Sequence, residues 1–162
     1  MSTGLGSLRV LLVDDNPHMR TIVATILMGV GIRHVRQAQD GAEALQALRA
    51  GPADLAIVDF QMQPLDGASF TRLVRGDAEG KNTYLPIIMM TSFADRVRVV
   101  EARDAGITEM IAKPLTARAV LDRLGAVIMR PRPFVRTDDY FGPMRRGIDA
   151  LPEPPRLREL AI

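Results

Sequence analysis

Charged and polar residues follow several short apolar runs of this sequence, in a pattern that could carry out chemistry. Asp14 and Asp15 come directly after one run, and Asp59 and Thr91 close two others. Lys113 follows a fourth run. Three carboxylates, a hydroxyl and an ammonium can bind a divalent cation and act on a phosphoryl group, provided that the fold brings them together.

The types of these residues favour a hard metal ion. Three carboxylates do not share a small site in ionised form unless a cation offsets their repulsion. Oxygen ligands without histidine or cysteine nearby select Mg²⁺, Mn²⁺ or Ca²⁺, and Mg²⁺ usually keeps water and phosphate oxygens among its ligands. One carboxylate could then attack a phosphoryl group, while Lys113 and the metal offset the developing charge. The Thr91 hydroxyl could donate a hydrogen bond to the finished acyl phosphate.

Each of these residues alone has a simpler interpretation. Asp14 or Asp15 would more often be a helix N-cap, and Lys113 a solvated surface charge. Asp59 and Thr91 would be ordinary loop or turn residues. The coincidence of the whole set at the ends of four separate strands, rather than any single member, favours a site.

The apolar runs that carry these residues have the character of buried parallel strands. They are short, rich in Val, Ile and Leu, and lack clean alternation with polar residues, as is typical of strands covered on both faces. Five such runs are present: Leu8–Val13, Val35–Ala38, Leu55–Asp59, Ile87–Thr91 and Met110–Ala112. Because the carboxyl ends of parallel strands meet at one edge of a sheet, we expect the candidate residues to converge there.

Segments of helical period separate the strands. The first is expected to bury one face, made by Met19, Ile22, Val23, Ile26, Leu27 and Val30. Asn16 is its predicted N-cap, followed by Pro17, and Asp40 with Glu43 has capping-box spacing at the second helix. Thr116 is predicted to cap the last helix. The buried stripe of that helix would consist of Val120, Leu121, Leu124 and Ile128.

Five strands alternating with five helices predict a doubly wound α/β fold. Right-handed crossovers restrict its topology, and we expect a flavodoxin-like (βα)5 parallel sheet of strand order 2-1-3-4-5. After Met129, the segment Arg130 to Pro133 breaks any helix, and Pro, Gly and Arg dominate to the end. The prediction is therefore a domain at residues 1–129 and a Pro/Arg-rich C-terminal extension at 130–162, partly disordered or docked.

The segments around the candidate residues resemble the receiver domains of two-component response regulators, of the stand-alone CheY-like type. The resemblance extends from Leu8 to Met129 with few length changes. It rests on four segments, Val13-Asp-Asp-Asn-Pro-His-Met-Arg20, Asp59-Phe-Gln-Met-Gln-Pro-Leu-Asp-Gly67, Met90-Thr-Ser92 and Ala112-Lys-Pro114.

The resemblance implies a magnesium site and a phosphoacceptor. Asp59 resembles the residue that accepts the phosphoryl group. Asp15 and Asp59 resemble direct Mg²⁺ ligands, whereas Asp14 would act through a water molecule. Gln61 would contribute its backbone carbonyl.

The resemblance also implies residues that respond to phosphorylation. Lys113 resembles the lysine that pairs with the phosphate, and Lys113–Pro114 the peptide that is usually cis. Thr91 resembles the switch hydroxyl, and Ser92 the small residue that admits the phosphoryl group.

Two places depart from the family pattern. After the phosphoacceptor, where the family often has Met-Pro, this chain has Met62-Gln63-Pro64, and the other departure is at the switch position. The family usually has an aromatic switch residue three places before the lysine, where this chain has Met110. Phe93 is an alternative residue for part of that role.

The implied function is that of a single-domain response regulator of a bacterial phosphorelay. Asp59 would take a phosphoryl group from a sensor histidine kinase or a histidine phosphotransfer protein with Mg²⁺. A change at the face of the fourth helix, fifth strand and fifth helix would then alter the binding of a downstream protein. Such a chain is not an enzyme beyond its own phosphorylation and slow autodephosphorylation. Phosphohydrolases of similar fold usually place a second Asp where this chain has Gln61.

Two other functions stay open, a phosphorylation-independent interaction module and an effector that binds a nucleotide second messenger through its tail. The extension holds Phe134, Tyr140 and Phe141 together with seven arginines, which suits either a docked tail or a partner-binding segment. Its proline spacing leaves no two adjacent helices, so no DNA-binding helix-turn-helix is expected. A homodimer also stays open.

Composition narrows the remaining classes. A net charge of +2 is too small to imply nucleic-acid binding, and the absence of cysteine excludes disulfides and cysteine-based zinc sites. No apolar run approaches the roughly 20 residues that span a bilayer, and no signal peptide is visible, so we expect a cytoplasmic protein without membrane insertion. Lys81 and Lys113 are the only lysines in an arginine-rich chain, which draws attention to the lysine at the candidate site.

Overall fold

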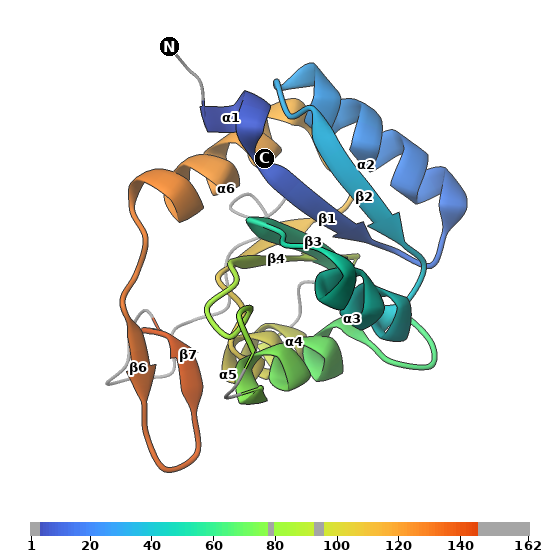
Figure 1. Ribbon diagram of the computed structural model, residues 1–162. Helices are drawn as coiled ribbons and strands as arrows, with labels where there is room; N and C mark the ends of the chain where they lie inside the picture. The colour runs from blue at the N-terminus through green and yellow to red at the C-terminus, as the bar shows by residue number, and fades with distance from the viewer. Residues whose placement is uncertain (1–3, 78–79, 93–95, 146–162) are drawn as a thin grey trace.

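A five-stranded parallel sheet forms the centre of the computed structural model, which describes residues 4–77, 80–92 and 96–145 (Figure 1). The strand order is β2-β1-β3-β4-β5, as the sequence predicts. The strands are β1 (Arg9–Val13), β2 (His34–Ala38), β3 (Leu55–Asp59), β4 (Ile87–Thr91) and β5 (Glu109–Ala112). The predicted bounds of β3 and β4 are confirmed at both ends, because these two strands are buried along their whole length.

Helices cover both faces of the sheet, which confirms the doubly wound architecture. α2 and α6 pack together on one face, and α3, α4 and α5 follow one another on the other. The helices are α1 (Gly4–Ser7), α2 (Pro17–Gly29), α3 (Gly41–Ala50), α4 (Gly67–Gly76), α5 (Arg96–Ala105) and α6 (Ala117–Met129). Since α1 is a short turn before the first strand, the predicted fourth and fifth helices correspond to α5 and α6.

The core has two layers because successive strand residues point to opposite faces. In β1, Val10 and Leu12 pack into the layer under α2 and α6. Leu11 and Val13 pack into the layer on the other side of the sheet. Met89 of β4 lies fully buried in this second layer.

The predicted helix caps are confirmed. The Asn16 side chain accepts hydrogen bonds from two backbone N–H groups at the start of α2. Asp40 accepts from the backbone N–H of Glu43 at 2.8 Å, and the Glu43 carboxylate accepts from that of Gln39 at 3.1 Å. Thr116 accepts from the third residue of α6 at 3.1 Å. Each cap satisfies a backbone donor that the helix itself leaves without a partner.

Two of the predicted apolar stripes are too wide. Ile22 of α2 is 50% exposed, and Leu121 and Ile128 of α6 are 45% and 43% exposed. Each of these side chains lies at the flank of its helix rather than against the sheet. In α6 the buried face is completed by smaller residues that the stripe omitted, namely Ala119, Ala126 and Val127.

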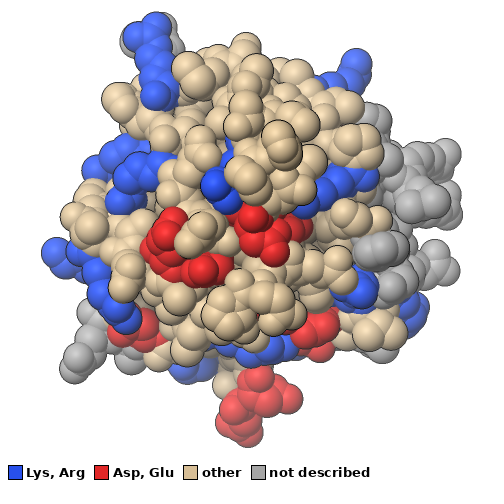
Figure 2. All heavy atoms as spheres, turned by 90° about the vertical axis from the view of Figure 1, so that its right-hand side faces the viewer, with Lys and Arg blue, Asp and Glu red and all other residues tan. Residues whose placement is uncertain are grey.

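The carboxyl ends of the strands point to the right-hand side of Figure 1. Figure 2 looks at the molecule from that side. It shows acidic side chains gathered near the middle of the face, with Lys and Arg side chains around them. The small net charge of the chain therefore conceals a local concentration of carboxylates.

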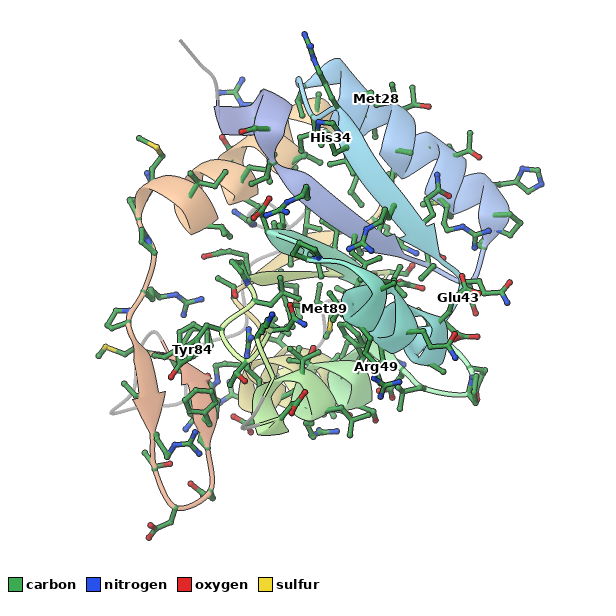
Figure 3. All side chains as sticks on the ribbon, in the orientation of Figure 1. Met28, His34, Glu43, Arg49, Tyr84 and Met89 are labelled. Atoms are coloured by element: carbon green, nitrogen blue, oxygen red, sulfur yellow. The ribbon has the colours of Figure 1, made fainter. Side chains whose placement is uncertain are left out.

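The first part of the C-terminal extension is a docked hairpin. α6 ends at Met129, as the following Arg-Pro segment predicts, and the chain continues into antiparallel strands β6 (Phe134–Arg136) and β7 (Phe141–Pro143). Tyr84, just before β4, packs edge-on against the rings of Phe134 and Phe141, with centroids 4.9 and 5.6 Å apart (Figure 3). The hairpin thus lies at the amino-terminal end of the sheet. Residues 146–162 lie outside the described part of the chain.

A buried arginine lies beneath this hairpin. Arg75 of α4 is 4% exposed and donates to the backbone carbonyls of Gly106, Thr83 and Leu85 at 2.6–3.0 Å. Its guanidinium carbon lies 4.9 Å from the centre of the Phe134 ring. Burial lowers the pKa of Arg75 to about 10. The carbonyls and the ring together stabilise a cation that has left water.

Candidate functional site

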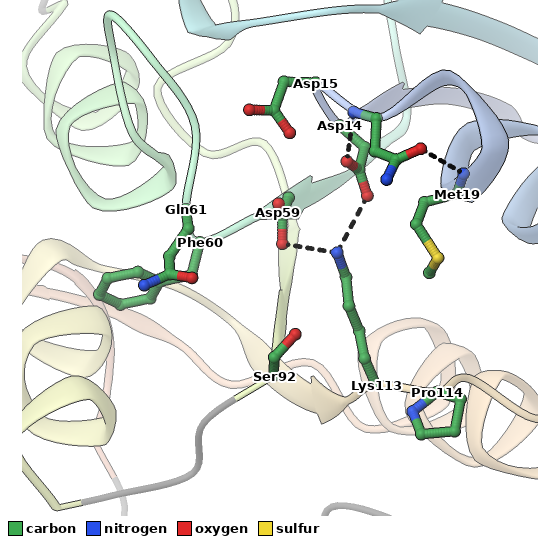
Figure 4. A pocket seen from close by; sticks show the side chains of 10 residues that line it. Asp14, Asp15, Met19, Asp59, Phe60, Gln61, Ser92, Lys113 and Pro114 are labelled. Carbon is green, nitrogen blue, oxygen red and sulfur yellow. Dashed lines mark hydrogen bonds and ion pairs between the residues drawn. The ribbon is translucent and has the colours of Figure 1, made fainter.

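A pocket opens at the carboxyl edge of the sheet, where the sequence predicts a site (Figure 4). Most of the predicted site residues line it. The lining residues are Asp14, Asp15, Asn16, Met19, Asp59, Phe60, Gln61, Ser92, Lys113 and Pro114.

Strand register explains why the charged residues meet. Val13 of β1 pairs with Val58 of β3, so the residues that follow, Asp14 and Asp59, lie beside each other. On the other side of β3, pairing continues through β4 to β5, and the backbone N–H of Lys113 donates to the carbonyl of Thr91 at 2.9 Å. Four strands of one parallel sheet therefore deliver the whole set to one edge.

Lys113 joins two of the carboxylates. Its Nζ lies 2.9 Å from Oδ1 of Asp59 and 3.1 Å from Oδ2 of Asp14. Asp14 is wholly buried, and its Oδ1 also accepts from the backbone N–H of Asn16 at 2.9 Å. Asp15 is exposed to solvent at the mouth of the pocket. Lys113 thus fixes the two buried carboxylates, while the exposed Asp15 remains able to bind a hydrated ion.

Opposing effects act on the pKa of the Asp59 carboxyl group. Burial raises the pKa of Asp59 to about 6, and the neighbouring Asp14 and Asp15 add to the rise, whereas Lys113 opposes it. Burial also disfavours the charged form of Lys113, but its bonds to Asp59 and Asp14 prevail and raise its pKa. The Lys113 ammonium is therefore firmly held, but its single positive charge does not balance the three neighbouring carboxylates.

The carboxylates fit a divalent metal ion. Asp14, Asp15 and Asp59 each offer an oxygen, and these atoms lie within 4.8 Å of one another. None of the lining residues is a histidine or a cysteine. A cluster of hard oxygen donors that faces water suits Mg²⁺, which retains several of its water ligands in proteins.

The remaining predicted residues occupy different places. Ser92 and Pro114 line the pocket, and the Lys113–Pro114 peptide is cis, as the resemblance implies. Thr91 is buried at the end of β4 and is not among the lining residues. Met110 is buried in β5 within the layer that also holds Met89. Phe93 lies outside the described residues.

The sequence alone did not predict a role for Arg98, which lies beside the pocket, or for Phe60, which lines it. The guanidinium carbon of Arg98, in the first turn of α5, lies 5.5 Å from the centre of the Phe60 ring. The Gln61 amide is assigned with its oxygen toward Arg98, because only that orientation lets it accept from Arg98 Nη1 at 2.8 Å and Nη2 at 3.1 Å. A helix that follows a parallel strand begins at the same sheet edge, and that position was the available signal for Arg98.

This fold and this constellation together define a signalling domain of the receiver class. The chain belongs to the response regulator receiver family: the family model described as "Response regulator receiver domain" matches residues 10–125. It is therefore a receiver of two-component signalling, similar to CheY.

Its relatives include chemotaxis proteins. It is 34% identical to chemotaxis protein CheY-3 of Vibrio cholerae, over 76% of this chain and 94% of that protein. It is 32% identical to chemotaxis protein CheY of Pseudomonas aeruginosa, over 76% and 98% of the two chains.

Solved structures share the fold. A structure of Vibrio cholerae CheY4 superposes with a TM-score of 0.68 at 30% identity, covering 75% of this chain and 98% of that one. The receiver domain of the sensor histidine kinase PA1611 from Pseudomonas aeruginosa, with a magnesium ion coordinated in its active site cleft, gives a TM-score of 0.65 at 29% identity. That comparison covers 73% and 94% of the two chains. Within the described residues of the present chain, no helix is long and apolar enough to cross a membrane.

Proposed function

We propose that this chain is a phosphorylation-dependent response regulator that accepts a phosphoryl group on Asp59. The observation that carries the proposal is the position of the Asp59 carboxylate. It closes the central strand β3, lies 2.9 Å from the Lys113 ammonium and shares the pocket with Asp14 and Asp15.

The transfer is a nucleophilic displacement at phosphorus. An oxygen of ionised Asp59 forms a bond to phosphorus while the bond from phosphorus to the imidazole nitrogen of a donor phosphohistidine breaks, and the imidazole leaves with the electron pair. A pKa of about 6 leaves the Asp59 carboxylate mostly ionised at neutral pH. Lys113 lies close enough to pair with an oxygen of a phosphoryl group on Asp59, since its ammonium already contacts that carboxylate.

Mg²⁺ is the proposed cofactor. Bound in this pocket, it would neutralise the carboxylates and draw charge from the transferred phosphoryl group. Asp15 and Asp59 would hold it directly, Asp14 through water, and Gln61 through its backbone carbonyl. The proposal draws on the three-carboxylate cluster and on the magnesium ion in the PA1611 receiver domain.

We propose two kinds of partner, one that donates the phosphoryl group and one that responds to it. A sensor histidine kinase or a histidine phosphotransfer protein would donate, and a downstream protein would bind the face formed by α5, β5 and α6. Two large apolar side chains on these helices, Val97 and Leu121, are 75% and 45% exposed. Such side chains are available to a partner. Beyond its own phosphorylation and slow autodephosphorylation, we propose no enzymatic activity.

Incubation with acetyl phosphate and Mg²⁺, followed by intact mass measurement, tests the proposal. The wild-type chain should gain the mass of one phosphoryl group, and the gain should disappear with EDTA or with Asp59→Asn. Asp66→Asn serves as the matched control, because Asp66 caps α4 and does not line the pocket. A wild-type chain that stays unlabelled would favour the phosphorylation-independent interaction module instead.

A further inference from the structure

We infer that Arg98 is a positioning residue of the phosphorylation site, and that it acts by orienting the Gln61 side chain. The inference rests on the proposed phosphorylation of Asp59. Gln61 lies two residues beyond Asp59 and lines the pocket, whereas Arg98 comes from α5, a separate element. The two side chains meet at 2.8 and 3.1 Å.

The Phe60 ring holds the Arg98 guanidinium in place. Its guanidinium carbon lies 5.5 Å from the centre of the Phe60 ring, within the range of a cation–π contact. Phe60 is 5% exposed and follows the phosphoacceptor directly, so its ring is a firm support. Two adjacent residues therefore bind the guanidinium, Phe60 through its ring and Gln61 through its amide oxygen.

The hydrogen-bonding inventory of the two side chains dictates the orientation of the amide. An arginine has donors and no acceptor, whereas a glutamine amide has an oxygen that accepts and a nitrogen that donates. Facing Arg98, the amide must present its oxygen, which leaves the NH₂ group as the end that can serve the pocket. In Figure 4, which draws the Gln61 amide in the opposite orientation, Asp59 lies between Gln61 on one side and Lys113 on the other.

This orientation suits a phosphorylated site and the opposite orientation does not. A phosphoryl group on Asp59 carries anionic oxygens, which attract an N–H donor and repel an amide oxygen. Without Arg98, the Gln61 oxygen would lose the donors that hold it, and the amide could turn this oxygen toward the anion. Arg98 therefore selects one of two amide orientations, and its guanidinium need not enter the pocket to do so.

Beryllofluoride with Mg²⁺, titrated into the full chain and followed by NMR, provides a suitable probe because it mimics the phosphoryl group. Arg98→Ala should weaken the binding by about tenfold, the size of one hydrogen bond to a charged group. Arg98→Lys keeps a donor-only side chain and should recover part of the loss. Arg96→Ala removes the same charge from the first turn of the same helix and should bind like wild type.

A double-mutant cycle shows whether Arg98 acts through Gln61. Gln61→Ala should weaken beryllofluoride binding as much as Arg98→Ala, and the double variant should lose no more than either single variant. Additive losses would overturn the inference, because Arg98 would then act on the anion by itself. Unchanged binding by Arg98→Ala would also overturn it.

The same titration separates this inference from the proposed function. If the wild-type chain neither binds beryllofluoride nor gains a phosphoryl group, the proposed function fails. If the wild-type chain does both and Arg98→Ala matches it, only the role of Arg98 fails. Thermal melts of each variant exclude unfolding as the cause of a loss.

Discussion

At the scale of single residues, the decisive balance is between burial and charge at Asp59. Its carboxylate lies 2.9 Å from Lys113, a contact that favours the ionised form. Burial and the two neighbouring aspartates outweigh that contact, and the pKa rises to about 6. The site therefore destabilises the ionised carboxylate, which prepares it to bind a metal ion or to form an acyl phosphate.

This balance predicts how stability depends on pH without Mg²⁺. Because the folded chain holds the Asp59 proton more tightly than the unfolded chain, the contribution of Asp59 to the free energy of unfolding is greatest below about pH 4 and falls until about pH 6. Asp59→Asn mimics the protonated side chain, so it should be more stable than wild type at pH 7.5, by up to about 3 kcal/mol. Denaturant unfolding in EDTA at pH 4.5 and 7.5 measures the difference, which should shrink at the lower pH. A less stable Asp59→Asn at pH 7.5 would mean that the Lys113 bond prevails over burial.

Lys113 gives a second prediction at this scale. Its ammonium contacts Asp59 and Asp14 at once, and its side chain is only 13% exposed. Arginine keeps the charge but presents a wide planar fork, which this confined position does not accommodate. Lys113→Arg should retain part of its labelling by acetyl phosphate yet fail to switch. Beryllofluoride should then leave the amide NMR shifts of α5 and β5 nearly unchanged. Shifts equal to those of wild type would show that any cation suffices.

At the scale of elements, sequence reasoning succeeds where burial alone defines an element. The strands Leu55–Asp59 and Ile87–Thr91 are buried throughout, so the apolar run and the strand coincide. The apolar stripe of α6 is less predictable, because the period does not say how wide a strip the sheet covers. Leu121 at its flank is large and exposed, whereas Ala119 is small and buried.

The hairpin and Arg98 lay beyond sequence reasoning for a different reason. Phe134 packs on Tyr84 and Arg75, which are about 50 and 60 positions away along the chain, and no local pattern links them. Arg98 likewise meets Gln61 only after two strands have paired. Partners of this kind require the fold itself.

A prediction at the element scale concerns the hairpin's hold on Arg75. Phe134→Ala removes the ring that lies over the buried guanidinium and packs against Tyr84. We expect a loss of about 2 kcal/mol in the free energy of unfolding, from the lost cation–π and aromatic contacts. Chemical denaturation measures it, with Asp138→Ala, an exposed residue between the two strands of the hairpin, as the control. No loss would mean that the hairpin does not stabilise Arg75.

At the scale of the whole molecule, the two ends of the sheet have separate tasks. The carboxyl end holds the proposed phosphorylation pocket, and the amino-terminal end holds the hairpin. Just after the hairpin, Arg145 forms an ion pair of 2.5 Å with Asp104 of α5. The hairpin joins the end of α6 to α4 and α5, so the described part of the extension, residues 130–145, contacts the body of the domain without approaching Asp59.

Removal of residues 130–162 tests that separation. A chain ending at Met129 should be labelled by acetyl phosphate at a rate close to that of the full chain, because the pocket lies at the opposite end of the sheet. It should melt several degrees lower, since it lacks the hairpin contacts. A folded but unlabelled product would contradict the separation, and an unchanged melting temperature would contradict the stabilising role of the hairpin.

The measurement that tests the central claim most directly is the location of the phosphoryl group. After reaction with acetyl phosphate and Mg²⁺, borohydride reduces an acyl phosphate and converts the modified aspartate to homoserine, which peptide mass mapping locates. The structure predicts homoserine at position 59 and unmodified aspartate at positions 14 and 15. Homoserine at position 14 or 15, or its absence from a labelled chain, would contradict the assignment of Asp59.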